Sequence, residues 1–175
     1  MTVGVLAVQG AFAEMEAYWR SQGADIFEIR QLVDLEHGMD LLALPGGEST
    51  VQGKLLKDLG LFVPLKERID RGLRVFAVCA GLILLAQKIE NDSATWFGSL
   101  PVTVRRNAYG RQLGSFNTIG TLHGKPDVPM TFIRAPAITA ISPEVEVLSS
   151  FNGAPTTVRW RNITAFTWHP ELNVC

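Results

Sequence analysis

One cysteine in the sequence stands where a nucleophile could work. Cys79 follows an apolar run at 73–78, predicted as a buried strand, and precedes a predicted helix at 80–89. Residues 77–81 read Ala-Val-Cys-Ala-Gly, and a sharp strand-to-helix turn needs such small residues around its central side chain. The amino end of a helix also favours the thiolate. The pattern indicates a cysteine nucleophile; the alternative is a buried cysteine without chemistry.

A base for this nucleophile lies late in the chain. His169 follows a predicted strand at 164–168, so we expect it at the same edge of the sheet as Cys79. Pro170 favours an extended backbone at His169 and limits where the next side chain can point. Glu171 could then orient the imidazole and stabilise its charged form. The alternative is an exposed His-Pro-Glu turn.

Two further segments could bind charge. Residues 44–50 read Leu-Pro-Gly-Gly-Glu-Ser-Thr and follow a predicted strand at 41–44, so backbone N–H groups at the two glycines could bind an oxyanion. The alternative is a plain Gly-Gly turn before a helix whose N-cap is Ser49. Residues 105–111 hold three arginines, which could bind a carboxylate or could form a solvated hairpin.

Composition excludes several classes of protein. The chain has 175 residues, 47% of them hydrophobic, which predicts one domain over 1–175. Sixteen Lys and Arg against seventeen Asp and Glu give a net charge of −1, with no basic stripe for nucleic acid. The longest apolar run, 75–86, is too short to span a membrane.

The cysteine and histidine positions predict the compartment and argue against a metal site. Two cysteines make no disulfide framework, and the N-terminus has no basic region typical of a secretory leader, so we expect a cytoplasmic protein. No Cys/His pair has metal-ligand spacing. His37 and His123 lie in glycine-flanked loops and are predicted to be solvated.

The order of predicted elements indicates an α/β fold. In the first half, short apolar strands alternate with helices, which is typical of parallel βαβ units. The second half contains only short strands separated by turn residues, which favours antiparallel pairing. The predicted strands are 3–8, 25–30, 41–44, 73–78, 102–105, 112–118, 130–134, 137–141, 145–150, 156–160 and 164–168, and the predicted helices are 11–21, 49–59, 64–71 and 80–89.

Several motifs together resemble those of the glutaminase subunits of pyridoxal 5′-phosphate synthases, which are class I (triad) glutamine amidotransferases. The similar segments are 5–13 (VLAVQGAFA), 44–50 (LPGGEST), 79–86 (CAGLILLA), 106–116 (RNAYGRQLGSF), 132–136 (FIRAP) and 166–172 (FTWHPEL). A Cys-Ala-Gly turn with a late His-Pro-Glu marks the wider class. The motifs in the first, fourth and fifth segments are more specific and favour this subunit over other amidotransferases.

The resemblance implies a three-layer, flavodoxin-like fold and hydrolysis of L-glutamine to glutamate and ammonia, with no cofactor and no metal. It gives Cys79 the role of nucleophile, with His169 and Glu171 completing a triad. It implies that the N–H groups of Gly47 and Ala80 bind the oxyanion. The implied glutamine-binding residues are Gly46, Gly47, Glu48, Arg106, Ile133 and Arg134.

The implied partner is a synthase subunit that receives the ammonia, in a large hetero-oligomer. Activity that depends on docking would follow if the peptide between Gly46 and Gly47 must reorient, which glycines permit. The chain departs from the family by having Ala77 and Val78 where Gly-Thr is usual, and by stopping soon after Glu171. Two alternatives therefore stay open: another Cys-His-Glu amidotransferase or hydrolase, and a catalytically impaired regulatory subunit.

Overall fold

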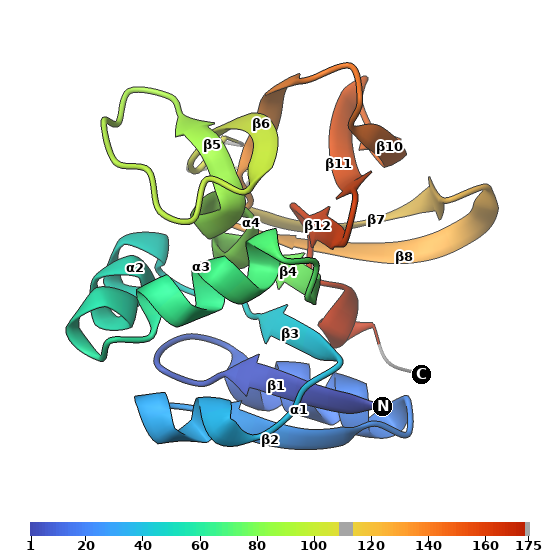
Figure 1. The fold of residues 1–175 in the computed structure, drawn as a ribbon. Helices are drawn as coiled ribbons and strands as arrows, with labels where there is room; N and C mark the ends of the chain where they lie inside the picture. The colour runs from blue at the N-terminus through green and yellow to red at the C-terminus, as the bar shows by residue number, and fades with distance from the viewer. Residues whose placement is uncertain (109–113, 174–175) are drawn as a thin grey trace.

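The computed structural model describes residues 1–108 and 114–173, and its main element is a seven-stranded sheet (Figure 1). The strand order is β10-β11-β12-β4-β3-β1-β2. The strands are β1 (Thr2–Leu6), β2 (Asp25–Ile29), β3 (Leu41–Leu44), β4 (Arg74–Val78), β10 (Glu146–Phe151), β11 (Ala154–Trp160) and β12 (Ile163–Phe166). The five strands from β12 to β2 run parallel, whereas β11 and β10 continue the sheet antiparallel. The predicted α/β class with an antiparallel extension is confirmed.

Helices cover both faces of this sheet. Because side chains alternate along a strand, β3 contributes Leu42 and Leu44 to one core, and Leu41 and Ala43 to the other. The first core contains α2 (Ser49–Asp58), α3 (Phe62–Asp70) and α4 (Ala80–Leu85). The second contains α1 (Phe12–Ser21) and part of β8 (Lys125–Ile133). The result is three layers, with the carboxyl ends of the parallel strands left free for a site.

Two smaller sheets complete the chain. One has the order β5-β6-β9 and is formed by β5 (Ala86–Ile89), β6 (Leu100–Arg105) and β9 (Ala137–Ile141). The other is a hairpin of β7 (Ser115–Leu122) with β8, which projects from the body (Figure 1). Two 3₁₀ helices, η1 (Leu32–Glu36) and η2 (Pro170–Leu172), follow β2 and β12.

The structure corrects the predicted helix 80–89. The helix ends at Leu85, and the chain continues as β5, in which Ala86 pairs in parallel with Leu100 of β6. A buried apolar run has no polar face that would separate a helix from a strand, so its own residues could not locate this change.

Smaller corrections concern element ends. Ser49 is the first residue of α2 and is buried; the N-cap position is Glu48, whose side chain makes no capping bond. The last strand ends at Phe166, two residues earlier than predicted. Gln112 and Leu113, the predicted start of another strand, lie outside the described residues.

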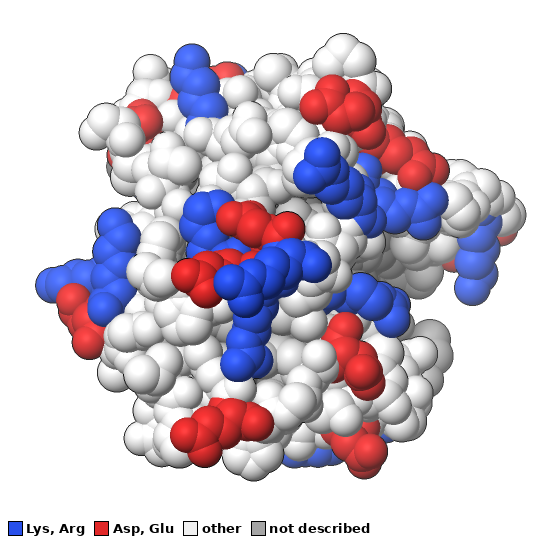
Figure 2. All heavy atoms as spheres, in the orientation of Figure 1, with Lys and Arg blue, Asp and Glu red and all other residues white. Residues whose placement is uncertain are grey.

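The surface carries both signs of charge. Figure 2 shows Lys and Arg interleaved with Asp and Glu on the face it presents, with no broad area of one sign. Within residues 1–108 and 114–173, no helix is both long and apolar enough to cross a bilayer, and no His, Cys, Asp and Glu side chains gather into a group that could hold a metal ion. His37 and His123 are exposed, as predicted.

Candidate active site

Cys79 occupies a strained turn between β4 and α4. Its φ of 51° and ψ of −100° lie outside the regions that side chains with a Cβ normally adopt. Its backbone N–H donates to the Phe166 carbonyl at 2.8 Å, which ties the turn to β12. A Cβ on Gly81 would lie 2.5 Å from the Leu44 carbonyl oxygen, so glycine is needed where α4 crosses β3. The small residues around Cys79 therefore have a packing reason.

His169 reaches the same edge because β12 is the direct neighbour of β4, with Phe166 paired to Val78. Its Nδ1 lies 2.7 Å from Oε1 of Glu171, and both side chains are buried. The His169 backbone N–H donates to the Thr131 carbonyl at 2.8 Å, and η2 begins at the next residue. Glu171 thus holds the imidazole ring, and β8 holds the backbone of His169.

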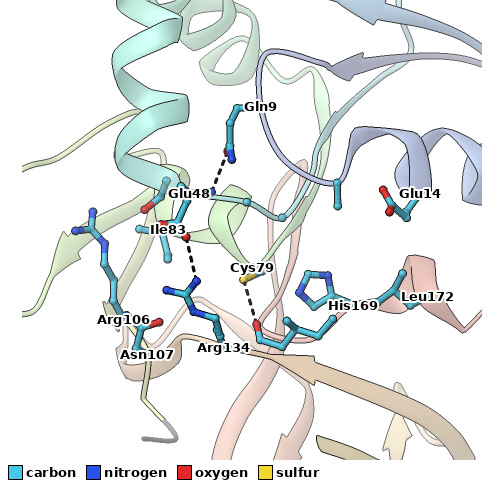
Figure 3. Close-up of a pocket in the computed structure, with 15 residues that line it drawn as sticks. Gln9, Glu14, Glu48, Cys79, Ile83, Arg106, Asn107, Arg134, His169 and Leu172 are labelled. Atoms are coloured by element: carbon cyan, nitrogen blue, oxygen red, sulfur yellow. Dashed lines mark hydrogen bonds and ion pairs between the residues drawn. The ribbon is translucent and has the colours of Figure 1, made fainter. Parts of the chain in front are cut away.

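The loop after β3 places Cys79 and His169 together. A Cβ on Gly46 would lie 2.6 Å from Cε1 of His169 and 3.6 Å from Cβ of Cys79, so both residues contact the same glycine. Figure 3 shows the thiol and the imidazole beside each other, facing one space. Nε2 of His169 has no hydrogen-bond partner among the described residues, which leaves it available to the sulfur.

The surroundings of His169 favour its protonated form. Burial of the ring lowers its pKa, but the adjacent Cys79 sulfur and the Glu171 carboxylate outweigh burial and raise the pKa to about 9. A ring that holds its proton at neutral pH can stabilise a thiolate beside it and can later donate the proton to a leaving group.

These groups open into a cavity of about 350 Å³ (Figure 3). Such a volume suits a small molecule. Most of the residues singled out from the sequence line it: Cys79, His169, Gly46, Gly47, Glu48, Arg106, Ile133 and Arg134. Two do not line it: Glu171 lies behind the imidazole, and Ala80 is buried at the start of α4.

Two arginines stand at the cavity wall. Nη1 of Arg106 lies 2.7 Å from the Asp92 carboxylate, while its Nε and Nη2 are buried without a partner in the described part of the chain. Arg134 forms an exposed ion pair with Glu48 at 3.3 Å. Of the basic segment 105–111, Arg106 therefore faces the cavity, Arg105 is exposed, and Arg111 lies outside the described residues.

The diglycine peptide has a defined orientation. The Gly46 carbonyl accepts a hydrogen bond from Ala11 N–H at 3.0 Å. Ala11 follows β1 and Cys79 follows β4, and β3 lies between these strands. Since the N–H of a trans peptide points away from its carbonyl, the Gly47 N–H is directed away from Ala11 and the loop after β1. Any reorientation of this peptide must break the Ala11 hydrogen bond.

Two glutamines near the site received no role in the sequence analysis. Gln9, in the loop after β1, accepts a hydrogen bond from Glu48 N–H, in the loop after β3, through its side-chain oxygen at 2.9 Å. Gln52 donates hydrogen bonds to the backbone of both loops. The helical periodicity could have identified Gln52, because this polar residue lies one turn before Leu56, on the apolar side of α2.

Comparison with known proteins gives close relatives over nearly the whole chain. Residues 5–174 match the model of the SNO glutamine amidotransferase family. The chain is 53% identical over 173 residues to the pyridoxal 5′-phosphate synthase subunit PdxT of Desulfitobacterium hafniense, covering 99% of this chain and 87% of that one. It is 49% identical to the PdxT subunit of Methanocorpusculum labreanum, covering 98% and 90%. A solved glutamine amidotransferase structure superposes with a TM-score of 0.92 at 38% identity, covering 98% and 91%.

Proposed function

Because the chain belongs to the SNO glutamine amidotransferase family, we propose that it is the glutaminase subunit of a pyridoxal 5′-phosphate synthase. In this role it hydrolyses L-glutamine to L-glutamate and ammonia, and a separate synthase subunit consumes the ammonia. Relatives that carry this subunit's name support the proposal, with identities near one half over almost the full chain. The observation that carries it is the meeting of Cys79 with the His169–Glu171 pair at one cavity.

The proposed reaction begins with attack of the Cys79 thiolate on the side-chain amide carbon of glutamine. The Gly47 N–H, which points away from the loop after β1, and the Ala80 N–H, which α4 leaves unpaired at its first turn, bind the oxyanion. Protonated His169 gives its proton to the departing nitrogen, so ammonia leaves and a glutamyl thioester remains. Neutral His169 then takes a proton from water as the water oxygen attacks the thioester carbon, and the C–S bond breaks to release glutamate and the Cys79 thiolate. Glu171 keeps the ring oriented throughout.

The cavity wall offers groups for the two charges at the other end of glutamine. Arg106 lines the cavity, and its guanidinium suits the α-carboxylate. Glu48 is an exposed carboxylate at the rim and suits the α-ammonium group. Gly46, Ile133 and Arg134 complete the proposed binding surface.

A partner is part of this proposal for a chemical reason. Ammonia released into neutral water is mostly protonated and is then no nucleophile, so the product needs a protected route to its acceptor. We assign the subunit to a large hetero-oligomer with the synthase subunit. We also place it in the cytoplasm, where a thiol nucleophile stays reduced.

The test is glutamate release by the wild type and by Cys79→Ala, each with and without the synthase subunit. We expect turnover mainly from the wild type with its partner, and none from Cys79→Ala. Equal rates for the two proteins would refute the assignment. Hydrolysis of other amides in preference to glutamine would favour a different hydrolase. A folded complex without any turnover would favour a regulatory subunit.

A further inference from the structure

Gln52 is a polar residue in an apolar place. It lies on α2 with an exposed fraction of 0%, on the same side of the helix as Leu56, which belongs to the core beneath the sheet. Its Oε1 is buried and has no hydrogen-bond partner among residues 1–108 and 114–173. An unpaired buried acceptor destabilises a fold, so packing alone would favour an apolar side chain at this position.

The amide nitrogen of Gln52 joins two loops of the site. Its Nε2 donates to the Gln9 carbonyl at 2.9 Å and to the Pro45 carbonyl at 3.4 Å. Both partners are acceptors, so the nitrogen and not the oxygen must face them, which leaves Oε1 unpaired. The first acceptor belongs to the loop after β1, and the second belongs to the loop that carries Gly46 and Gly47.

These bonds belong to a set that determines the diglycine geometry. Ala11 N–H holds the Gly46 carbonyl, and the Gln9 side chain accepts from Glu48 N–H. A Cβ on Gly47 would lie 3.0 Å from Nε2 of Gln52, so the amide packs directly against the peptide whose N–H is proposed to bind the oxyanion. Gln52 is the member of this set that lies on a helix, and it contacts both loops from α2.

We infer that Gln52 is a positioning residue, which holds the loops of Gln9 and Gly46 together so that the Gly47 N–H stays directed at the oxyanion. Gln52 does not line the cavity and touches no reacting atom. The inference rests on the proposed function, because it concerns residues that hold the orientation of the Gly47 N–H, the proposed oxyanion donor.

The test separates oxyanion binding from thiolate reactivity in the complex with the synthase subunit. A glutamine-mimicking chloroketone develops an oxyanion as Cys79 attacks its carbonyl, whereas iodoacetamide reacts at a saturated carbon without one. In Gln52→Met, which keeps the side-chain length but loses the amide, we expect the chloroketone rate to fall about tenfold or more. The iodoacetamide rate should stay unchanged. Gln22→Met, at an exposed glutamine after α1, is the matched control and should change neither rate.

Equal rates in Gln52→Met and wild type for both reagents, or an equal fall for both, would overturn the inference. If Gln52→Met does not fold, Gln52→Glu answers the same question. A protonated glutamic acid can donate to the Gln9 carbonyl and a carboxylate cannot, so the ratio of chloroketone to iodoacetamide rates should recover as the pH falls; a ratio independent of pH would overturn the inference. Failure of the wild type itself to react with the chloroketone would instead refute the proposed function.

Discussion

The buried pair of His169 and Glu171 predicts that the free energy of unfolding depends on pH. A single substitution should make this dependence weaker. Glu171→Gln keeps the size of the side chain and an acceptor for Nδ1 of His169, but removes the negative charge 2.7 Å from the ring. Burial then opposes the imidazolium with less compensation, so the pKa of His169 should fall. The change acts on a side chain that is almost fully buried, so solvent screens it little.

The magnitude follows from the raised pKa. The pKa of His169 is about 9 in the folded chain, against an ordinary value of 6.5, and each unit corresponds to about 1.4 kcal/mol. A group whose folded pKa is raised contributes its full stability below the unfolded pKa and loses it as the pH rises through the folded pKa. Between pH 6 and pH 10 the wild type should therefore lose about 3 kcal/mol of unfolding free energy from this group.

Urea unfolding at both pH values measures the effect. We expect the free energy of unfolding to fall less in Glu171→Gln than in the wild type, because the charge of Glu171 no longer favours the charged ring. Glu36→Gln, at an exposed carboxylate in η1, controls for the loss of a carboxylate alone and should lose as much free energy as the wild type. Equal losses in wild type and Glu171→Gln would refute the reasoning about the pair.

Two further predictions concern the backbone of the site. Gly81→Ala places a Cβ 2.5 Å from the Leu44 carbonyl oxygen and should lower the unfolding free energy by about 1–3 kcal/mol, whereas Gly38→Ala, with nothing within 4 Å, should leave it unchanged. Equal denaturation midpoints for these two variants would contradict the packing argument. Cys79→Gly should be more stable than Cys79→Ala by about 1–2 kcal/mol, because alanine keeps the Cβ that strains a residue at φ 51°. Thermal unfolding of both variants checks this, and an equal Tm would show that the turn is not strained.

Local sequence was sufficient for elements with strong, uninterrupted patterns. The apolar run before Pro45 becomes β3 with the predicted bounds, and the run before Cys79 becomes β4. Apart from Arg74 at the exposed start of β4, both strands are buried on two faces, so their residues had to be apolar. The strand-to-helix position of Cys79 followed directly.

Features that depend on distant residues could not be predicted in this way. The end of α4 at Leu85 depends on β6, which offers Leu100 and its neighbours as pairing partners. The start of α2 at Ser49 follows from Gln9, which holds Glu48 N–H and keeps that residue extended. The bonds of Gln52 likewise connect loops far apart in the chain. A local pattern can indicate that Gln52 is misplaced on an apolar face, but only the fold shows what it contacts.

The neighbourhood of β4 and β12 in the sheet has a consequence for the timing of synthesis. The strand that carries the sulfur is made in the first half of the chain, but the strand that delivers the imidazole is the last strand described. A growing polypeptide interrupted before Ile163 holds the Cys79 thiol without His169, its proposed base, and without β12, one of the two strands that pair with β4. The proposed hydrolysis therefore needs β12 and His169 to have left the ribosome, so a fragment that ends before Ile163 would hydrolyse no glutamine.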